Sequence, residues 1–304
     1  MTKLWLLLAI ALLSVTALAV ISYLRADINQ YTPEAGPTDS AAKPARIVSL
    51  APNLTEILFE LGLAEQVVAV SSDSDYPPEA AGRQQLGTFW QPDAEAIIAA
   101  RPDLVIALDF EQQRAVAETL KRLGYRVLTL KIKTIQDLFA AIDGIGAAAG
   151  CEHQAHQLTG RIKEQMESLK SRFGSADKVK VLWVVQTEPL RVAGTNTFVS
   201  ELLEFAGGLN AIAPTVQQYP QIAAEEMLAC APQVIVQSAM AADDLGAQQE
   251  AAELFWKQWP ALPAVKNGRV YVVDSDTILR LGPRLPKGIE DLARCLHPQK
   301  HGGR

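Results

Sequence analysis

One corner motif occurs twice in this chain. EAIIAARPDLVIA begins at Glu95 and EEMLACAPQVIVQ begins at Glu225, and each combines a glutamate, an apolar helical turn, a proline seven residues after the glutamate, and a strand. Both the apolar pattern and the proline spacing are repeated. The repeat therefore predicts that the chain builds the same helix-to-strand unit in two equivalent lobes.

Short β-branched runs alternate with helical patterns on both sides of a long charged segment. Because these runs are apolar without polar alternation, they are typical of parallel strands buried on both faces. The charged segment predicts a connecting helix at 151–173, since apolar residues recur three or four positions apart at Leu158, Ile162, Met166, Leu169 and Phe173. The pattern favours an α/β fold of two lobes joined by one helix, with a single large doubly wound sheet as the alternative.

The N-terminal region predicts export. An almost unbroken apolar run follows Lys3, and residues 4–24 have about the ~20-residue length of a membrane-crossing helix. Ala17-Leu18-Ala19 resembles a cleavage site, so the run is either a removed signal peptide or an uncleaved anchor in the inner membrane. In both cases the body is predicted to be periplasmic or extracytoplasmic. The predicted limits are 1–24 for this leader, 25–44 for a polar flexible linker, 45–150 for the N-terminal lobe, 151–173 for the helix, 174–298 for the C-terminal lobe and 299–304 for a tail.

Composition and missing motifs exclude several classes of function. The net charge of −6, without a Lys/Arg-rich run, disfavours nucleic-acid binding. No GxSxG elbow, phosphate-binding GxxxxGK[ST] loop or strand followed by GxGxxG is present, so we expect no enzyme and no catalytic residue. No histidine follows a predicted strand, and we expect no metal site; His153 and His156 with Glu152 favour a solvated helix face over a surface metal.

The three cysteines, Cys151, Cys230 and Cys295, lack CxxC spacing. They are either buried small residues or include one disulfide pair.

We expect the protein to be a monomer.

The loops that follow the predicted strands are apolar, aromatic or acidic. They include Ala51-Pro52-Asn53, SSDSDYPP, Asp109-Phe110 and DSDTILRLGPR. Parallel α/β folds place their sites at these strand ends. Such loops favour a ligand that is held by surface contact and a few polar anchors.

Several segments together resemble a known family. RIVSLAPNLTEILFELGL, SSDSDYPPEA, LKRLGYRVLTL, GTNTFVSELLEFAGGLN and YPQIAAEEMLACAPQVIV, with the first corner, occur in family order between Arg46 and His297. The chain resembles the helical-backbone (class III) substrate-binding proteins of ABC importers, most nearly the cobalamin binders, with siderophore and haem binders as relatives. The resemblance implies two Rossmann-like lobes, a rigid connecting helix, an interlobe ligand cleft and only slight closure.

The resemblance also implies a partner for the repeated glutamates. In this family one glutamate from each lobe meets arginines of the permease, which works with an ATPase, and these glutamates correspond to Glu95 and Glu225. The alternative is that both are first-turn acids favoured by the helix dipole.

The ligand implied by the resemblance is a corrinoid, a small-molecule metal chelate related to cobalamin, and no separate cofactor is implied. This chain has Asp73 and Leu108 at positions where the cobalamin binders are aromatic, and Tyr219 in place of a tryptophan. A ferric siderophore or haem therefore stays an alternative ligand, and a membrane-anchored sensor without transport is an alternative function.

The resemblance also implies an Asp-x-x-x-Arg pair in the second lobe, which here is Asp276 and Arg280. This pair is either part of the site or a surface ion pair on one helical turn. The expected ligand-binding residues are Pro52, Asp73, Phe89, Trp90, Phe110, Tyr219, Asp276 and Arg280.

Overall fold

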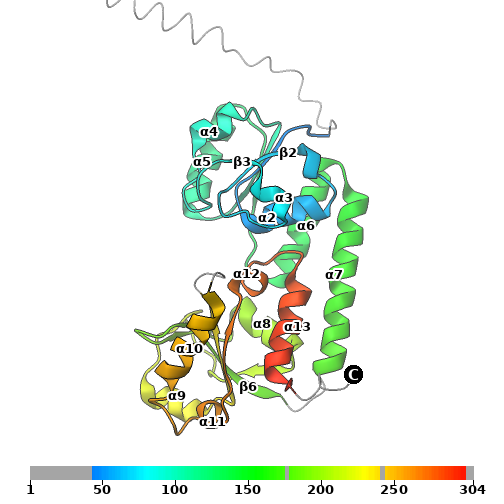
Figure 1. Ribbon diagram of the computed structural model, residues 1–304. Coiled ribbons are helices and arrows are strands. Elements are labelled where there is room, and N and C mark those ends of the chain that lie inside the picture. Colours follow the sequence, from blue (N-terminus) through cyan, green and yellow to red (C-terminus); the bar gives the residue numbers. More distant parts are fainter. Residues whose placement is uncertain (1–42, 175–177, 240–243, 299–304) are drawn as a thin grey trace, which may run out of the picture. The chain divides into compact units, whose positions relative to one another are not determined.

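The computed structural model describes residues 43–174, 178–239 and 244–298, which belong to one compact unit (Figure 1). The predicted leader at 1–24, the predicted tail at 299–304 and all but the last two residues of the predicted linker at 25–44 lie outside these residues. Within the described part of the chain, no helix combines the length and apolar character needed to cross a membrane.

The N-terminal lobe is a parallel five-stranded sheet with helices between its strands. The strand order is β3-β2-β1-β4-β5, and every neighbouring pair is parallel. The central strands β1 and β4 are apolar except for Ser49 and are almost completely buried. The elements are β1 (Ile47–Ser49), α2 (Pro52–Glu60), η1 (Ala64–Gln66), β2 (Val67–Val70), α3 (Pro78–Ala81), β3 (Gln84–Gln85), α4 (Ala94–Ala99), β4 (Leu104–Leu108), α5 (Glu111–Arg122), β5 (Val127–Leu130) and α6 (Ile135–Ala149).

The C-terminal lobe has its own five-stranded sheet. Its strands run in the order β10-β9-β6-β7, β8 also pairs with β6, and only the β6–β7 pair is antiparallel. The two separate sheets confirm the predicted two-lobe α/β fold and exclude the single large sheet. The elements are β6 (Val179–Gln186), β7 (Arg191–Val192), α8 (Phe198–Phe205), β8 (Gly208–Asn210), α9 (Ala224–Cys230), β9 (Val234–Ser238), α10 (Leu245–Trp256), α11 (Pro263–Lys266), β10 (Val270–Val273), α12 (Ser275–Ile278) and α13 (Leu285–Leu296).

A 22-residue helix, α7 (Glu152–Phe173), connects the lobes. It lies beside α6 of the first lobe and α13 of the second (Figure 1). Of the five apolar positions predicted to form its inner face, Leu169 is half-buried and the other four are buried. Gly146 lets α6 approach closely, because a Cβ there would collide with Ala155 of α7. A single hydrophobic cluster runs from the first lobe through α7 into the second, so the helix is packed against both.

The repeated corner is equivalent in backbone geometry as well as in sequence. Arg101 and Ala231, the residues directly before the two prolines, have positive φ angles of 48° and 45°. The residue after each proline exchanges two hydrogen bonds with the beginning of its lobe's first strand. Asp103 does so with Arg46, and Gln233 does so with Lys180. The two corners therefore join their helices to matching strands in the same way.

A second connection between the lobes is made by the bridging segment, residues 276–285, which leads from α12 into α13. Arg284 donates two hydrogen bonds to Glu56 of α2, at 2.9 and 2.6 Å. Glu56 is only 2% exposed, and the Arg284 guanidinium lies over the Tyr76 ring, 4.1 Å from its centroid. The Asn53 side-chain amide donates to the Leu281 carbonyl at 3.1 Å. The C-terminal lobe is thus fastened directly to the first helix of the N-terminal lobe.

The buried Glu56–Arg284 pair yields a stability prediction. Burial raises the pKa of Glu56 above its usual value, although the hydrogen bonds and charge of Arg284 oppose this. Removing one partner of a buried ion pair leaves the other charge without compensation, so Glu56→Gln should lower the free energy of unfolding by about 2–4 kcal/mol. Urea denaturation measures this loss.

Glu60→Gln is the matched control, because Glu60 lies on the same helix and pairs with Arg161 at 3.0 Å on the exposed surface. An exposed pair contributes about 0–1 kcal/mol. Equal losses in the two variants would contradict a structural role for the buried pair.

Candidate functional site

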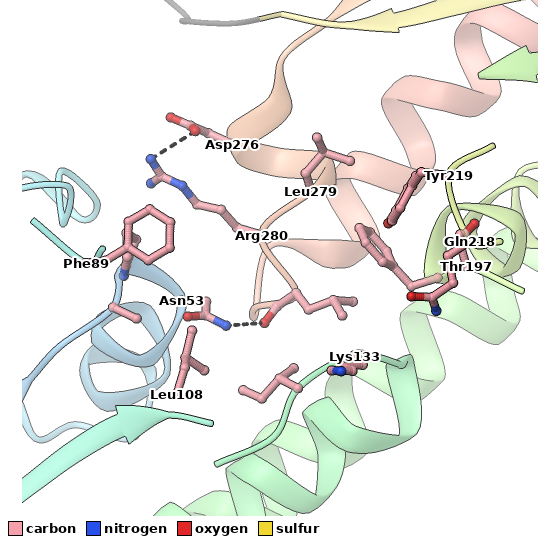
Figure 2. Close-up of a pocket in the computed structure, with 15 residues that line it drawn as sticks. Asn53, Phe89, Leu108, Lys133, Thr197, Gln218, Tyr219, Asp276, Leu279 and Arg280 are labelled. Carbon is pink, nitrogen blue, oxygen red and sulfur yellow. Dashed lines mark hydrogen bonds and ion pairs between the residues drawn. The ribbon is translucent and has the colours of Figure 1, made fainter. Parts of the chain in front are cut away.

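Residues of both lobes line a cleft with a volume of about 490 Å³ (Figure 2). The N-terminal lobe contributes the last residue of β4, residues that follow β1 and β5, and one loop aromatic. The C-terminal lobe contributes the start of α8, the loop before α9 and the bridging segment. The lining residues are Ala51, Pro52, Asn53, Phe89, Leu108, Ile132, Lys133, Thr197, Phe198, Gln218, Tyr219, Asp276, Leu279, Arg280 and Leu281. Because parallel strands end at the same edge of a sheet, residues distant in sequence meet here.

The cleft has aromatic rings from both lobes. Phe89 comes from the N-terminal lobe and Tyr219 from the C-terminal lobe, and Figure 2 shows them on opposite sides of the cleft. Phe198, the first residue of α8, also lines it. Apolar side chains such as Leu108, Ile132 and Leu279 complete the surface. The arrangement can hold a broad, mostly apolar ligand between two sets of rings.

Phe89 is held through its own backbone. Its N–H donates to the Asp73 carboxylate at 2.6 Å, and its carbonyl accepts from the Gln113 side chain at 2.8 Å. Gln113 is fully buried, donates also to the Leu50 carbonyl and accepts from the Leu108 N–H, each at 2.7 Å. Gln113 thus connects three strand-end loops, and from α5 it helps to hold the Phe89 backbone in place.

Two predicted site aromatics lie beside Phe89 and are not among the lining residues. The ring centroids of Trp90 and Phe110 lie 4.4 and 6.0 Å from that of Phe89, and 5.2 Å from each other. Trp90 is 55% exposed. Asp73 is likewise absent from the lining, since its carboxylate is engaged by the Phe89 N–H. The other five predicted residues, Pro52, Phe89, Tyr219, Asp276 and Arg280, line the cleft together.

Arg280 is bound by carboxylates from both lobes. Its guanidinium pairs with Asp276 at 2.9 Å, the one-turn pair expected from the sequence (Figure 2). It also pairs at 2.6 Å with Asp75, which belongs to the loop after β2 in the N-terminal lobe. Sequence spacing gave no indication of this second partner, because it lies 205 residues away. Arg280 therefore presents little uncompensated positive charge to the cleft.

The pKa values of the two carboxylates shift in opposite directions. Burial raises the pKa of Asp276, and although Arg280 lowers it, the negative charges of Asp75 and Asp274 raise it further. Burial would also raise the pKa of Asp75, but the hydrogen bond and charge of Arg280 outweigh burial and hold it below its usual value. Asp75 therefore stays ionised to lower pH than Asp276.

Polar lining residues that the sequence did not single out lie on the side of the cleft away from Arg280 in Figure 2. Thr197 caps α8 and donates to the Gly194 carbonyl, and Gln218 donates to the Asn196 carbonyl. Lys133 is exposed and has no carboxylate partner among the described residues. Nothing in the sequence marks these three residues as neighbours, because they come together only in the folded chain.

The cysteines and histidines form no site in the described part of the chain. Within it, no group of three or more His, Cys, Asp or Glu residues is arranged to hold a metal ion. Cys151 is buried, Cys230 and Cys295 are partly buried, and all three are free thiols, so the alternative of a disulfide is wrong for this structure. Burial raises the pKa of the Cys295 thiol to about 11.

Both repeated glutamates are exposed in the first turn of their helices. Glu95 lies on α4, where Asp93 caps the helix by accepting from the N–H groups of Glu95 and Ala96. Glu225 lies on α9, beside exposed Glu226. Neither Glu95 nor Glu225 has an ion-pair partner among the described residues. Packing and intramolecular charge pairing thus leave both carboxylates available at the surface.

Comparison with known proteins identifies the family. The sequence pattern described as "Periplasmic binding protein" matches residues 47–277. The chain belongs to the periplasmic binding protein family. The vitamin B12-binding protein of Vibrio parahaemolyticus is 30% identical over 253 residues, which cover 83% of this chain and 88% of that protein. The resemblance found in the sequence is thereby confirmed.

Solved structures of family members share the fold. A possible iron-binding, periplasmic solute-binding protein of Staphylococcus epidermidis superimposes with a TM-score of 0.76 and 28% identity, covering 84% of this chain and 100% of that one. A periplasmic heme-binding protein of Pseudomonas aeruginosa gives a TM-score of 0.70 and 28% identity, covering 84% and 94%. As a family member, the chain is a substrate-binding component of an ABC importer, which is a transport role. These similar proteins carry names of different ligands, so family membership alone does not fix the ligand.

The Asp75–Arg280 pair predicts a pH dependence of stability. A carboxylate whose folded pKa lies below its unfolded value, here 3.8, contributes stability above that value and loses it as the pH falls through the folded pKa. Asp75→Asn should therefore lower the free energy of unfolding at pH 6 by less than about 1 kcal/mol, because the Asp75 side chain is 58% exposed. The difference between wild type and variant should shrink below about pH 4.

Urea denaturation at a series of pH values measures this difference. Glu79→Gln removes a nearby exposed carboxylate that has no ion-pair partner in the described residues and serves as the control. A difference between wild type and Asp75→Asn that stays constant down to pH values below the folded pKa would rule out the ion pair as its source.

Proposed function

We propose that this protein captures a corrinoid ligand of the cobalamin type in the interlobe cleft and delivers it to an ABC permease and ATPase complex. The observation that supports this most is the combination of aromatic rings on both sides of the cleft with an arginine already neutralised by two carboxylates. The proposal includes a periplasmic location for the body, with residues 4–24 as signal peptide or inner-membrane anchor.

The chemistry of a corrinoid matches the lining. A corrin is a wide apolar ring system with neutral amides around its rim, so it can contact Phe89 on one side and Phe198 and Tyr219 on the other. Amides both donate and accept hydrogen bonds, which suits the Asp276–Arg280 pair. An anionic siderophore would favour basic residues that are free to bind it. Arg280 is already paired with Asp75 and Asp276, so Lys133 is the one lining cation without a carboxylate partner in the described residues, which favours a ligand with few negative charges over a strongly anionic siderophore.

Haem is the second candidate. A porphyrin also suits aromatic and aliphatic surfaces, and its carboxylates could approach Lys133, whose ammonium has no carboxylate partner in the described residues. The similarity to a heme-binding protein of P. aeruginosa supports considering it.

Calorimetric titration tests the choice of ligand. With cobalamin, cobinamide, haemin and a ferric siderophore as probes, we expect one-to-one binding of the two corrinoids. Phe89→Ala and Tyr219→Ala should each weaken corrinoid binding by about tenfold, because each removes a ring from the cleft. Trp90→Ala is the control beside Phe89 and should have a smaller effect, since Trp90 does not line the cleft. Binding of haemin without binding of either corrinoid would contradict the proposal.

We further propose that Glu95 and Glu225 dock on the permease. Support comes from the equivalence of the two corners and from the exposure of both carboxylates without an intramolecular ion pair in the described residues. A two-lobed protein that sits across a two-fold symmetric permease needs the same charge on the same corner of each lobe. Such pairs contribute modestly to affinity but determine orientation and encounter rate.

Charge reversal tests the docking role. The double variant Glu95→Lys/Glu225→Lys should reduce ligand uptake by about tenfold or more in cells that express the cognate permease and ATPase, because like charges then face each other. Ligand affinity in solution should not change. Glu226→Lys adds a positive charge next to Glu225 and is the control. Uptake that is unchanged by the double variant would instead favour a sensor without transport.

A further inference from the structure

The charged residues of the cleft are distributed unevenly. Arg280 and Asp276 lie at one side, and Asp75 completes this group from the N-terminal lobe. Two carboxylates around one guanidinium give this group a formal charge of −1. Lys133 lies apart from it, towards Thr197 and Gln218 in Figure 2. A ligand in the cleft therefore meets a slightly negative group at one side and a single positive charge at the other.

The backbone of Lys133 is hydrogen-bonded, whereas its ammonium has no ion-pair partner among the described residues. Its N–H donates to the Asp137 carboxylate at 2.9 Å, within the cap that starts α6. Among the lining residues, Lys133 is the one cation without a carboxylate partner in the described part of the chain. Its ammonium can therefore reach a ligand without first breaking an ion pair.

From this distribution we propose that Lys133 is a specificity-determining residue that binds an anionic group on the rim of the ligand. The inference rests on the proposed corrinoid function. In a complete cobalamin the anionic group is the phosphodiester of the nucleotide loop, whereas cobinamide ends before this phosphate. Lys133 should thus distinguish the two corrinoids, while the rings and the Asp276–Arg280 pair bind the part that they share.

The experiment compares cobalamin with cobinamide by calorimetric titration of the whole exported body of the protein. Lys133→Gln should weaken cobalamin binding by about two- to fivefold, the effect of an exposed charge pair, and leave cobinamide binding unchanged. Lys133→Arg keeps the charge and should keep most of the preference. Lys131→Gln, an exposed lysine that does not line the cleft, is the matched control and should change neither affinity.

Salt gives an independent readout. The loss caused by Lys133→Gln should shrink as the salt concentration rises from about 0.02 M to about 0.3 M, because an exposed charge pair is screened. A side chain with only a structural role would affect both corrinoids alike and without this salt dependence.

The failures of the two proposals are distinguishable. If the wild-type protein binds both corrinoids and Lys133→Gln changes them equally or not at all, the role of Lys133 is wrong and the corrinoid function stands. If the wild-type protein binds neither corrinoid, both proposals are wrong.

Discussion

The ion pairs between the bridging segment and the N-terminal lobe hold the cleft in place. Arg284 reaches the buried carboxylate of Glu56, and Arg280 reaches Asp75. Together with α7, which packs against both lobes, they connect the lobes at two separate places. A buried ion pair resists separation, because either charge left alone in the interior is strongly unfavourable. The cleft is therefore formed before any ligand arrives, and preorganisation of this kind reduces the entropy lost on binding.

The same segment also sets the charge of the cleft. Arg280 lines the cleft, but Asp75 and Asp276 neutralise it, whereas Arg284 pairs with Glu56 and is not among the lining residues. Similar proteins in this family carry names of vitamin B12, heme and iron ligands on one shared fold. A fold of this kind hosts different ligands through a small number of side chains. We propose that here those side chains are the facing rings, the neutralised arginine and Lys133, all of which line the cleft.

Local sequence patterns predicted the fold well and the site in part. Apolar strand runs, helical spacing in α7 and the matched prolines are each set by neighbouring residues, and all of them correspond to the structure. The Asp276–Arg280 pair was predictable for the same reason, since four positions along the chain bring the two side chains together. Asp75, Gln113 and Lys133 were missed, because their roles depend on contacts that only the folded chain creates. Asp73 lies near the cleft as expected, but its carboxylate accepts from the Phe89 N–H.

Crystal structures with and without cobalamin would test most directly whether the cleft is a preformed ligand site. The corrin should lie between Phe89 and Tyr219, and Arg280 should keep both Asp75 and Asp276 as partners. The Cα positions of the two lobes should differ by about 1 Å or less between the structures, as in other preorganised complexes. A rotation of the lobes that separates Asp75 from Arg280, or a ligand bound outside the cleft, would contradict a preformed site.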